Sequence, residues 1–348
     1  MSRWDAADLP PPAPARTPRR WGLRIALGAV FLLVLGAAGL FAWGYQRFDA
    51  PGPAKDSVTI VIPKGLGIEA IGRRLREAGV VDQPLVLSLA ARLMRRAHLL
   101  KAGEYEFPAG ITPHEILDML VAGRTVVRRL TVPEGWTTAQ ILALIADAEG
   151  LDGPLTDRPA EGALLPETYH YSYGDSRSGL LRRMEGAMRQ ALDELWRQRA
   201  PNLPFATPAD AVTLASIVEK ETGNEAERPR VAAVFINRLR RGMKLDADPT
   251  VIYALTRGAQ PLDRPLSRTD LAIDDPYNTY RHAGLPPGPI AAPGRAALAA
   301  TLNPAETQDL YFVADGSGGH VFAETLDEHN RNVARLRQLE RGTGGAAP

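Results

Sequence analysis

The chain has 348 residues, a formal net charge of +1 and no cysteine. Its length suits two or three domains, and an apolar content of 45% is sufficient for buried cores. The balanced charge and the lack of a long basic run after residue 50 predict no nucleic-acid partner, while the missing cysteines exclude disulfides, thiol nucleophiles and cysteine metal sites.

The N-terminal residues predict a tail followed by a membrane anchor. Residues 1–24 contain a proline-rich patch and several arginines, a composition typical of a disordered basic tail. Residues 25–45 carry no charge, and a helix of 21 residues is long enough to cross about 30 Å of hydrocarbon. Trp21, Trp43 and Tyr45 lie near the two ends, where interfacial aromatics are expected. We therefore expect a single transmembrane helix.

A cleaved signal peptide is the alternative explanation of this stretch. Signal peptides have an apolar region of only about 7 to 15 residues, which favours the uncleaved anchor, although the Arg19-Arg20 pair resembles a twin-arginine signal. Because the arginines precede the apolar stretch, the N-terminus should remain in the cytoplasm. We predict a single-pass protein of the inner (plasma) membrane whose body, after Tyr45, is extracytoplasmic and hence periplasmic.

A sequence pattern that predicts a strand followed by a helix occurs three times after a linker at residues 46–54. Each copy reads as a strand end, a turn with Pro and Gly, and the start of an amphipathic helix with an Ile six residues after the Gly. The copies are Ile62–Gly65, Phe107–Gly110 and Val132–Gly135, followed by Ile71, Ile116 and Ile141. Generic packing produces the same phrase, so it indicates structure rather than function. We expect a small strand and helix module at residues 55–125 and a connecting strand and helix at residues 126–150.

The remaining chain predicts a larger mixed domain. Regular hydrophobic spacing is lost between residues 152 and 168, so we expect a domain boundary near residue 150 and a domain over residues 151–340. A helix over residues 180–199 and a hairpin near residue 315 belong to it, and residues 341–348 should form a disordered tail. The predicted fold class is α+β.

The stretch from Thr207 to Gly223 predicts a helix around which the rest of this domain is organised. Thr207 can cap the helix, Pro208 suits its first position, and Asp210 stands three residues after the cap. The helix should end near Gly223. A second helix should open at Arg228-Pro229.

One face of the first helix carries a carboxyl group among apolar side chains. At 100° per residue this face holds Leu214, Ile217, Val218 and Glu221. Poor hydration there raises the pKa of a carboxyl group and keeps it protonated, ready to donate near neutral pH. Two alternatives stay open: Glu221 is a partner-satisfied carboxylate near a helix end, or the acid is Glu219, at the margin of the apolar arc. We take Glu221 as the candidate catalytic acid.

Polar loops around this helix predict a binding groove. Glu167 stands among aromatic residues that could line a sugar-binding cleft or a half-buried loop. Loops rich in Tyr, Asn and Asp, and a segment with three prolines at residues 284–290, favour a rigid groove. The candidate substrate-binding residues are Glu167, Asn237, Asp248, Tyr277, Asn278 and Tyr280. No metalloprotease, nucleophile-elbow or phosphate-loop motif is present and the six histidines are scattered, so we expect no metal and no cofactor.

Several phrases, in order, resemble the endolytic murein transglycosylase (MltG, YceG-like) family. They are Ser216–Thr222, Val234–Leu239, Asp248–Val251, Tyr277–Tyr280, Gly284–Ile290 and Tyr311–Val313. The resemblance covers nearly everything after residue 20. It implies a single-span anchor, a LysM-like module and a catalytic domain that cuts peptidoglycan glycan strands internally, and it places the family's catalytic glutamate on Glu221. Leu165 and Asp246 depart from the family pattern, which puts fine substrate preference in doubt.

The resemblance also implies the chemistry of a lyase. Ordinary glycosidases need two carboxyl groups. A lytic transglycosylase needs one, because the 6-hydroxyl of N-acetylmuramic acid attacks the anomeric carbon within the same sugar and leaves a 1,6-anhydro end. We expect peptidoglycan strands as substrate, with cell-wall synthases as possible partners and termination of nascent strands as the outcome. A hydrolase using Asp248 or Glu167 to activate water, or a non-catalytic wall-binding scaffold, remains the alternative.

Overall fold

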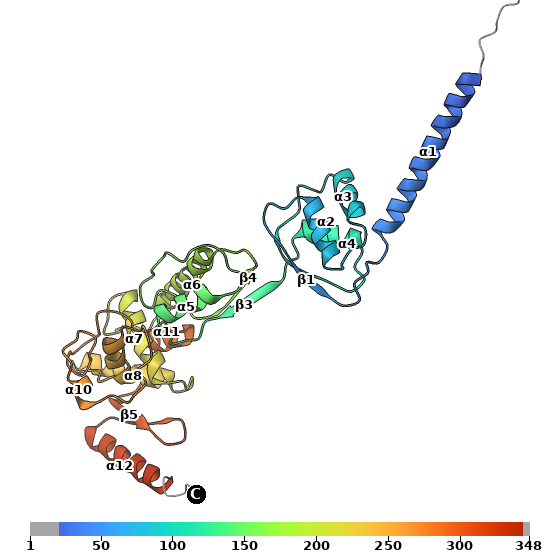
Figure 1. Ribbon diagram of the computed structural model, residues 1–348. Coiled ribbons are helices and arrows are strands. Elements are labelled where there is room, and N and C mark those ends of the chain that lie inside the picture. Colours follow the sequence, from blue (N-terminus) through green and yellow to red (C-terminus); the bar gives the residue numbers. More distant parts are fainter. Residues whose placement is uncertain (1–20, 344–348) are drawn as a thin grey trace, which may run out of the picture. The chain divides into compact units, whose positions relative to one another are not determined.

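The computed structural model describes residues 21–343, which form two compact units with the division between Arg124 and Thr125 (Figure 1). Most of the predicted N-terminal tail and residues 344–348 lie outside the described residues. Both units mix helices with short antiparallel strand pairs, so the predicted α+β class is confirmed.

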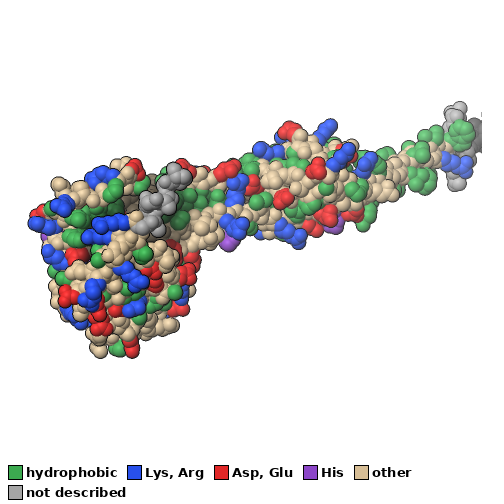
Figure 2. Space-filling view, turned by 90° about the horizontal axis from the view of Figure 1, so that it is seen from below, with side chains coloured by type: hydrophobic (Ala, Val, Ile, Leu, Met, Phe, Trp, Pro, Cys, Tyr) green, Lys and Arg blue, Asp and Glu red, His purple; other side chains and the backbone are tan. Residues whose placement is uncertain are grey.

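The first unit begins with helix α1, Trp21–Phe48, of 28 residues. Its side chains are almost all exposed, and within the described part of the chain it is the one helix long and apolar enough to cross a membrane. Figure 2 shows hydrophobic side chains (green) covering much of the segment that α1 forms, at the right of the view. The helix extends beyond the predicted span of residues 25–45 at both ends, so the start of the predicted linker is helical.

A small α+β module follows α1. Strand β1, Val58–Ile62, pairs antiparallel with β2, Gly103–Phe107, and helices α2, Ile68–Glu77, and α3, Pro84–Leu93, lie between them in the chain. Helix α4, Pro113–Ala122, comes after β2. The predicted order of strand, turn and helix is therefore found here.

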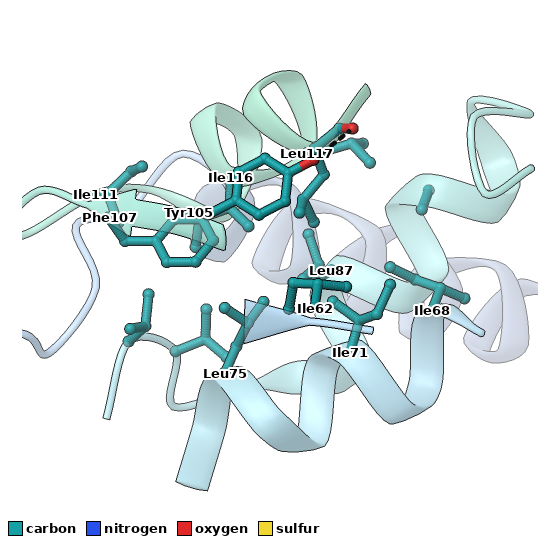
Figure 3. Packing of buried hydrophobic residues seen from close by; sticks show 14 of the residues in the cluster. Ile62, Ile68, Ile71, Leu75, Leu87, Tyr105, Phe107, Ile111, Ile116 and Leu117 are labelled. Atoms are coloured by element: carbon teal, nitrogen blue, oxygen red, sulfur yellow. Dashed lines mark hydrogen bonds between the residues drawn. The ribbon is translucent and has the colours of Figure 1, made fainter. Parts of the chain in front are cut away.

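The core of this module is made by alternate strand residues and one face of each helix (Figure 3). Ile60 lies opposite Tyr105 in the register, so the side chains of both strands reach the same face of the sheet. The Tyr105 hydroxyl donates to the Lys101 carbonyl at 2.7 Å, which satisfies a polar group inside the apolar core. The fully buried large side chains include Ile62, Ile71, Leu75, Leu87, Tyr105, Phe107, Ile116, Leu117 and Leu120.

The second unit begins earlier than the sequence predicted. Strand β3, Val127–Thr131, pairs with β4, Thr168–Ser172, and helix α5, Thr138–Asp147, lies between them. Leu130, Ile141, Ile145 and Tyr169 pack in one core. The segment predicted as a connector is thus part of the second unit, because its strand needs a partner that comes after residue 150. The loss of hydrophobic spacing near residue 152 marks a long loop instead of a boundary.

A helical layer carries the candidate site. It consists of α6, Arg177–Arg197; α7, Pro208–Glu221; α8, Arg228–Arg240; α9, Asp248–Thr256; α10, Arg268–Leu271; and α11, Arg295–Leu302. Helix α7 packs against α6, α8, α9 and α11. Its residues 211–218 are all buried, so α7 lies inside the layer.

The predicted start of α7 is confirmed in detail. The Thr207 hydroxyl accepts from the Asp210 backbone N–H at 3.2 Å, and the Asp210 carboxylate accepts from the Thr207 N–H at 3.0 Å, a capping box with Pro208 in the first position. The helix ends at Glu221, two residues before the predicted end, and Thr222 adopts an extended conformation.

The chain ends with a hairpin and a helix. Strands β5, Tyr311–Ala314, and β6, His320–Ala323, form the predicted hairpin, and α12, Leu326–Thr343, packs against both. The predicted disordered tail was placed too early, since residues 341–343 still belong to α12.

Replacing Thr207 with Ala tests how much the N-terminal cap of α7 contributes to the stability of the fold. The change removes the side-chain acceptor of the capping box, so we expect the free energy of unfolding to fall by about 1 kcal/mol. Urea titration of Thr207→Ala measures it. Thr325→Ala, which removes a cap-like contact from the exposed start of α12, is the control and should have a smaller effect; equal effects would contradict the central role of α7.

Candidate active site

Glu221 is the last residue of α7 and is half-buried. Leu214, Ile217 and Val218, which share its face, are fully buried, as the helical spacing predicts. Within residues 21–343 no hydrogen bond or ion pair is made to the Glu221 carboxyl group. The alternative that Glu221 is a carboxylate paired with a neighbouring group near the helix end is therefore wrong.

Burial raises the pKa of Glu221 to about 7, and the nearby charge of Asp248 adds to the rise while Arg238 opposes it. The end of a helix, where unpaired carbonyl groups concentrate negative potential, also disfavours an ionised carboxylate. A carboxyl group with a pKa near neutrality can donate a proton and, once ionised, accept one. This is the property required of a single acid and base.

Asp248 and Tyr280 lie beside this carboxyl group. Asp248 is the exposed first residue of α9, and the Tyr280 hydroxyl donates to its carboxylate at 2.7 Å. Burial raises the pKa of the Tyr280 hydroxyl, and the negative charges of Asp248, Asp246 and Glu221 raise it further. Tyr280 is thus kept as a hydrogen-bond donor, and the structure brings together three of the predicted site residues.

The loop that carries Tyr280 is fastened to the start of α9. The Ala247 N–H donates to the Thr279 hydroxyl at 3.0 Å, and the Thr250 and Thr279 hydroxyl groups lie 2.9 Å apart. Both threonines are fully buried. The pairing explains why the Asp-Pro-Thr and Tyr-Asn-Thr-Tyr phrases, about thirty residues apart, form one structure.

Asn278 supports this loop from inside. Its side-chain amide donates to the carbonyl groups of Leu271 and Ile273 at 3.1 and 2.8 Å, and its side-chain oxygen accepts from the Tyr280 N–H at 3.0 Å. The residue is fully buried. Its side-chain amide is thus used within the loop, and its predicted contact with sugar stays a prediction.

Asn237 has a similar internal role. Its amide donates to the carbonyl groups of Thr307 and Asp309 at 2.8 and 3.0 Å, which fastens α8 to the segment before β5. It is buried, and in the described part of the chain it makes no hydrogen bond to Glu221, Asp248 or Tyr280. Its predicted contact with sugar stays a prediction.

Glu167 also lies apart from the cluster. It is exposed, directly before β4, and its backbone carbonyl accepts from the Val132 N–H. Among the described residues no hydrogen bond or ion pair joins its side chain to Glu221. Its predicted place in a groove stays a prediction.

Tyr277, a predicted binding residue, belongs to a second group of side chains. The other members of this group were not predicted as site residues. Its ring packs against Tyr253 at 4.9 Å, and the Arg257 guanidinium lies over the Tyr277 ring. Burial raises the pKa of Tyr253 to about 12, with the charge of Glu161 contributing. Burial also raises the pKa of Glu161, whose carboxylate accepts from the Thr138 N–H and hydroxyl at 2.8 and 3.0 Å.

A cavity of about 310 Å³ lies next to this second group. Residues that line it include Thr137, Gln140, Lys220, Ile252, Tyr253 and Ile290. Lys220 directly precedes Glu221, so the cavity reaches the C-terminal end of α7. Tyr253 was visible in the sequence only as the end of the Asp-Pro-Thr phrase, and Glu161 lay in a segment without periodic spacing, which gave no signal.

Arg238 was also missed as a functional residue. Its buried guanidinium donates to the carbonyl groups of Leu310 and Leu245 at 2.7 and 2.8 Å and to the Asp246 carboxylate at 3.3 Å. Its charge lowers the pKa of Glu221. A basic residue one position after Asn237 on a buried helix was the available signal, since a buried arginine requires partners.

The rival acid, Glu219, is committed to holding structure. Its side chain is only 5% exposed; the carboxylate accepts from the Gly294 N–H at 2.9 Å and from the Arg228 guanidinium at 3.4 Å. Burial raises its pKa, and the Arg228 charge opposes the rise. Together with Ser216, whose hydroxyl accepts from the Ile290 N–H at 3.0 Å, Glu219 fastens residues 290–294 to α7. Of the two glutamates considered as the acid, Glu221 is the one whose carboxyl group has no hydrogen bond or ion pair among the described residues.

The histidines have separate partners. His320 contacts the Glu227 carboxylate at 2.8 Å, and His329 stacks on Tyr311. Among residues 21–343 no group of three or more His, Asp or Glu is arranged to hold a metal ion. The described site thus offers carboxyl and hydroxyl groups as its chemistry.

A poorly hydrated carboxyl group beside an aspartate, next in the chain to a residue that lines a cavity, defines a candidate acid catalyst. Comparison with known proteins identifies the family. The model of the YceG-like family matches residues 60–335, so the chain belongs to this family, as its motifs predicted.

Named relatives agree with this membership. The chain is 31% identical to a protein named endolytic murein transglycosylase from Streptococcus pneumoniae D39 over 88% of its own length, and it spans 63% of that relative. It is 32% identical to a protein of the same name from Bacillus subtilis 168, over 86% of this chain and 90% of the relative. A crystal structure of a yceG-like protein from Listeria monocytogenes is 30% identical, covers 80% of this chain and 99% of that one, and gives a TM-score of 0.47.

The raised pKa of Glu221 predicts a stability change in Glu221→Gln. The native pKa of about 7 exceeds the ordinary 4.5, so wild-type stability falls as pH rises from about 4.5 through 7. Glutamine carries no charge, and at pH 8 we expect Glu221→Gln to be more stable than wild type by about 2 to 3 kcal/mol. Denaturant unfolding at pH 8 and pH 4 measures this. At pH 4 the two proteins should be nearly equal, and a variant less stable than wild type at pH 8 would contradict the assignment.

Neutralising Asp248 should alter the pH dependence of any reaction that uses Glu221 as acid. The charge of Asp248 raises the pKa of Glu221, so Asp248→Asn lowers that pKa and moves the alkaline fall in rate to lower pH. The profile of kcat/KM against pH measures the shift. Asp263→Asn removes an equal charge at an exposed position and should leave the profile unchanged; an unshifted profile in Asp248→Asn would exclude the coupling.

Proposed function

We propose that this protein is a membrane-anchored lytic endotransglycosylase, a lyase that cleaves the bond between N-acetylmuramic acid and N-acetylglucosamine within peptidoglycan strands. The observation that carries the proposal is the half-buried Glu221 carboxyl group, without a partner among residues 21–343 and with a pKa of about 7. Family membership and the printed names of the relatives support the substrate class.

The first step uses the protonated form of Glu221. Its proton passes to the glycosidic oxygen as the bond from that oxygen to the anomeric carbon breaks, and the N-acetylglucosamine side leaves with a new hydroxyl group. Positive charge grows on the muramic acid ring during this step. Asp248, an exposed carboxylate that accepts a hydrogen bond from Tyr280, supports the proposal. A negative charge beside Glu221 would stabilise the positive charge that grows on the sugar ring.

The second step uses the ionised form. The 6-hydroxyl oxygen of the same muramic acid forms a bond to the anomeric carbon, and its proton passes to the Glu221 carboxylate, which restores the acid. No water is consumed, and the product has a 1,6-anhydro end. Because the attacking group belongs to the reacting sugar, its proximity lowers the barrier by several kcal/mol without a second catalytic carboxylate.

Binding of the strand is proposed for the residues around α7. In this proposal Tyr280 and Asp248 orient the sugar next to Glu221. The aromatic faces of Tyr277 and Tyr253 and the cavity beside Lys220, which has room for part of a sugar ring, support it. Asn278 and Asn237 act indirectly by holding these loops. No metal or cofactor takes part in the proposed reaction.

The first unit is proposed to hold the enzyme at its substrate. Helix α1 crosses the inner membrane with its N-terminus in the cytoplasm, and both α+β units lie in the periplasm. The order strand, helix, helix, strand from β1 to β2 supports a LysM-like module, which would contact glycan. Cutting strands next to the membrane would terminate their elongation, and cell-wall synthases are the proposed partners.

Digestion of purified sacculi by the full chain in detergent tests the function. We expect soluble fragments with 1,6-anhydro ends, identified by mass spectrometry from a mass 18 Da below that of the reducing product. Glu221→Gln should lose at least about a thousandfold in rate, because general acid and base steps each contribute about 10² to 10⁴.

Glu225→Gln is the matched control, since it removes an exposed carboxyl group four residues away and should retain full activity. Fragments with reducing ends would identify a hydrolase. Protein that sediments with sacculi and releases nothing would identify a wall-binding scaffold. Either result would overturn the proposal.

A further inference from the structure

Helix α3 exposes a row of leucines on its outer face. Leu85, Leu89 and Leu93 are 78%, 60% and 66% exposed, and their spacing of four residues places them on one side of the helix. Met94, the next residue, is 45% exposed. Scattered exposed leucines are ordinary, but an aligned row on one helix marks a contact surface.

The opposite face of α3 is also apolar. Val86, Leu87 and Ala91 are buried in the core of the module against α2 and α4. A helix with apolar side chains on two opposite faces needs an apolar environment on both. Ten residues span only about 15 Å, so α3 is too short to cross a bilayer.

The end of α1 is built into the same module. Phe48, its last residue, is buried in the module core and stacks on His114 at 4.9 Å, and the Asp49 carboxylate lies 3.0 Å from His114. Arg47 forms an ion pair with Asp82, directly before α3. The module is therefore attached to the end of the anchor without a flexible spacer.

Helix α3 packs beside the last turns of α1. A cavity of about 590 Å³ lies between them, and residues that line it include Leu40, Phe41 and Tyr45 of α1 and Val86, Leu89 and Leu93 of α3. The 28 residues of α1 extend over about 42 Å, while the hydrocarbon core of a bilayer is about 30 Å thick. With α1 as the anchor, the excess length puts the part of α1 that contacts α3 at the expected boundary between acyl chains and headgroups.

Two of the three arginines near the leucine row are paired within the module. Arg92 forms an ion pair with Glu69, and Arg96 with Asp118 at 2.6 Å, while Arg95 is exposed beside Met94. The leucine row itself is apolar, which fits acyl chains, and a single exposed arginine beside it does not require anionic lipid.

We propose that α3 lies in the membrane interface, with Leu85, Leu89 and Leu93 inserted among the acyl chains of the periplasmic leaflet and a lipid chain occupying the groove between α3 and α1. The inference rests on the proposed role of α1 as the anchor. The module would then contact the bilayer through two apolar helices, α1 and α3, instead of through α1 alone.

Site-directed spin labelling tests the proposal in the full chain reconstituted in phosphatidylcholine bilayers. The chain contains no cysteine, so a label at Leu85→Cys, Leu89→Cys or Leu93→Cys is unique. Power saturation compares collisions with oxygen, which concentrates in lipid, and with a nickel chelate, which stays in water. We expect oxygen collisions to exceed nickel collisions severalfold at all three positions.

Two control positions separate this proposal from the anchor itself. A label at Glu106→Cys, on the strand face opposite Tyr105 and Phe107, should favour nickel. A label at Leu33→Cys, in the middle of α1, should favour oxygen. If the labels on α3 collide mainly with the nickel chelate while the label at Leu33→Cys collides mainly with oxygen, α3 does not insert into the membrane although α1 does. This result would overturn the proposal.

Two further results would also overturn the proposal. Nickel access at Leu33→Cys would remove the anchor and with it the seating of α3. Labels on α3 shielded from both agents would indicate a protein contact, either a second copy or another partner, in place of lipid.

Discussion

Poor hydration of one carboxyl group at the end of α7 is the constraint on which the rest of the site depends. Glu221 shares a helical face with Leu214, Ile217 and Val218, and the helix end adds its own negative potential. Burial therefore raises the pKa of Glu221 to about 7, a value at which one carboxyl group can donate a proton and then accept one. A more hydrated or ion-paired carboxylate at this position would have no proton to give at neutral pH.

The surrounding structure keeps that group poorly hydrated and in place. Buried polar side chains hold the segments around it: Ser216 and Glu219 hold residues 290–294 against α7, and Asn278 holds the Tyr280 loop. Tyr280 and Asp248 are hydrogen-bonded to each other and lie beside Glu221. The site therefore combines one poorly hydrated carboxyl group with a rigid frame, which is what preorganised catalysis requires.

Local features of the fold could be predicted from the sequence, and long-range ones could not. The Thr207 cap, the face that carries Glu221 and the hairpin near residue 315 follow from short-range spacing and turn chemistry. The domain division was misplaced because β3 pairs with β4, and the paired residues are 37 to 45 positions apart in the chain, from Thr131↔Thr168 to Val127↔Ser172. The internal hydrogen bonds of Asn237 and Asn278 could not be predicted, because a polar side chain looks the same in sequence whether it faces solvent or a buried carbonyl group. Glu161 and Arg238 were missed because their partners come from distant segments.

The most direct test of the central claim is the titration of the Glu221 carboxyl group itself. Carbon-13 NMR of protein labelled at the glutamate side-chain carboxyl carbon, assigned by comparison with Glu221→Gln, follows this group alone through the pH range. The account predicts a titration centred near pH 7, well above the ordinary glutamate value. A titration centred near 4.5 would show a hydrated, ionised carboxylate at neutral pH and would contradict the account.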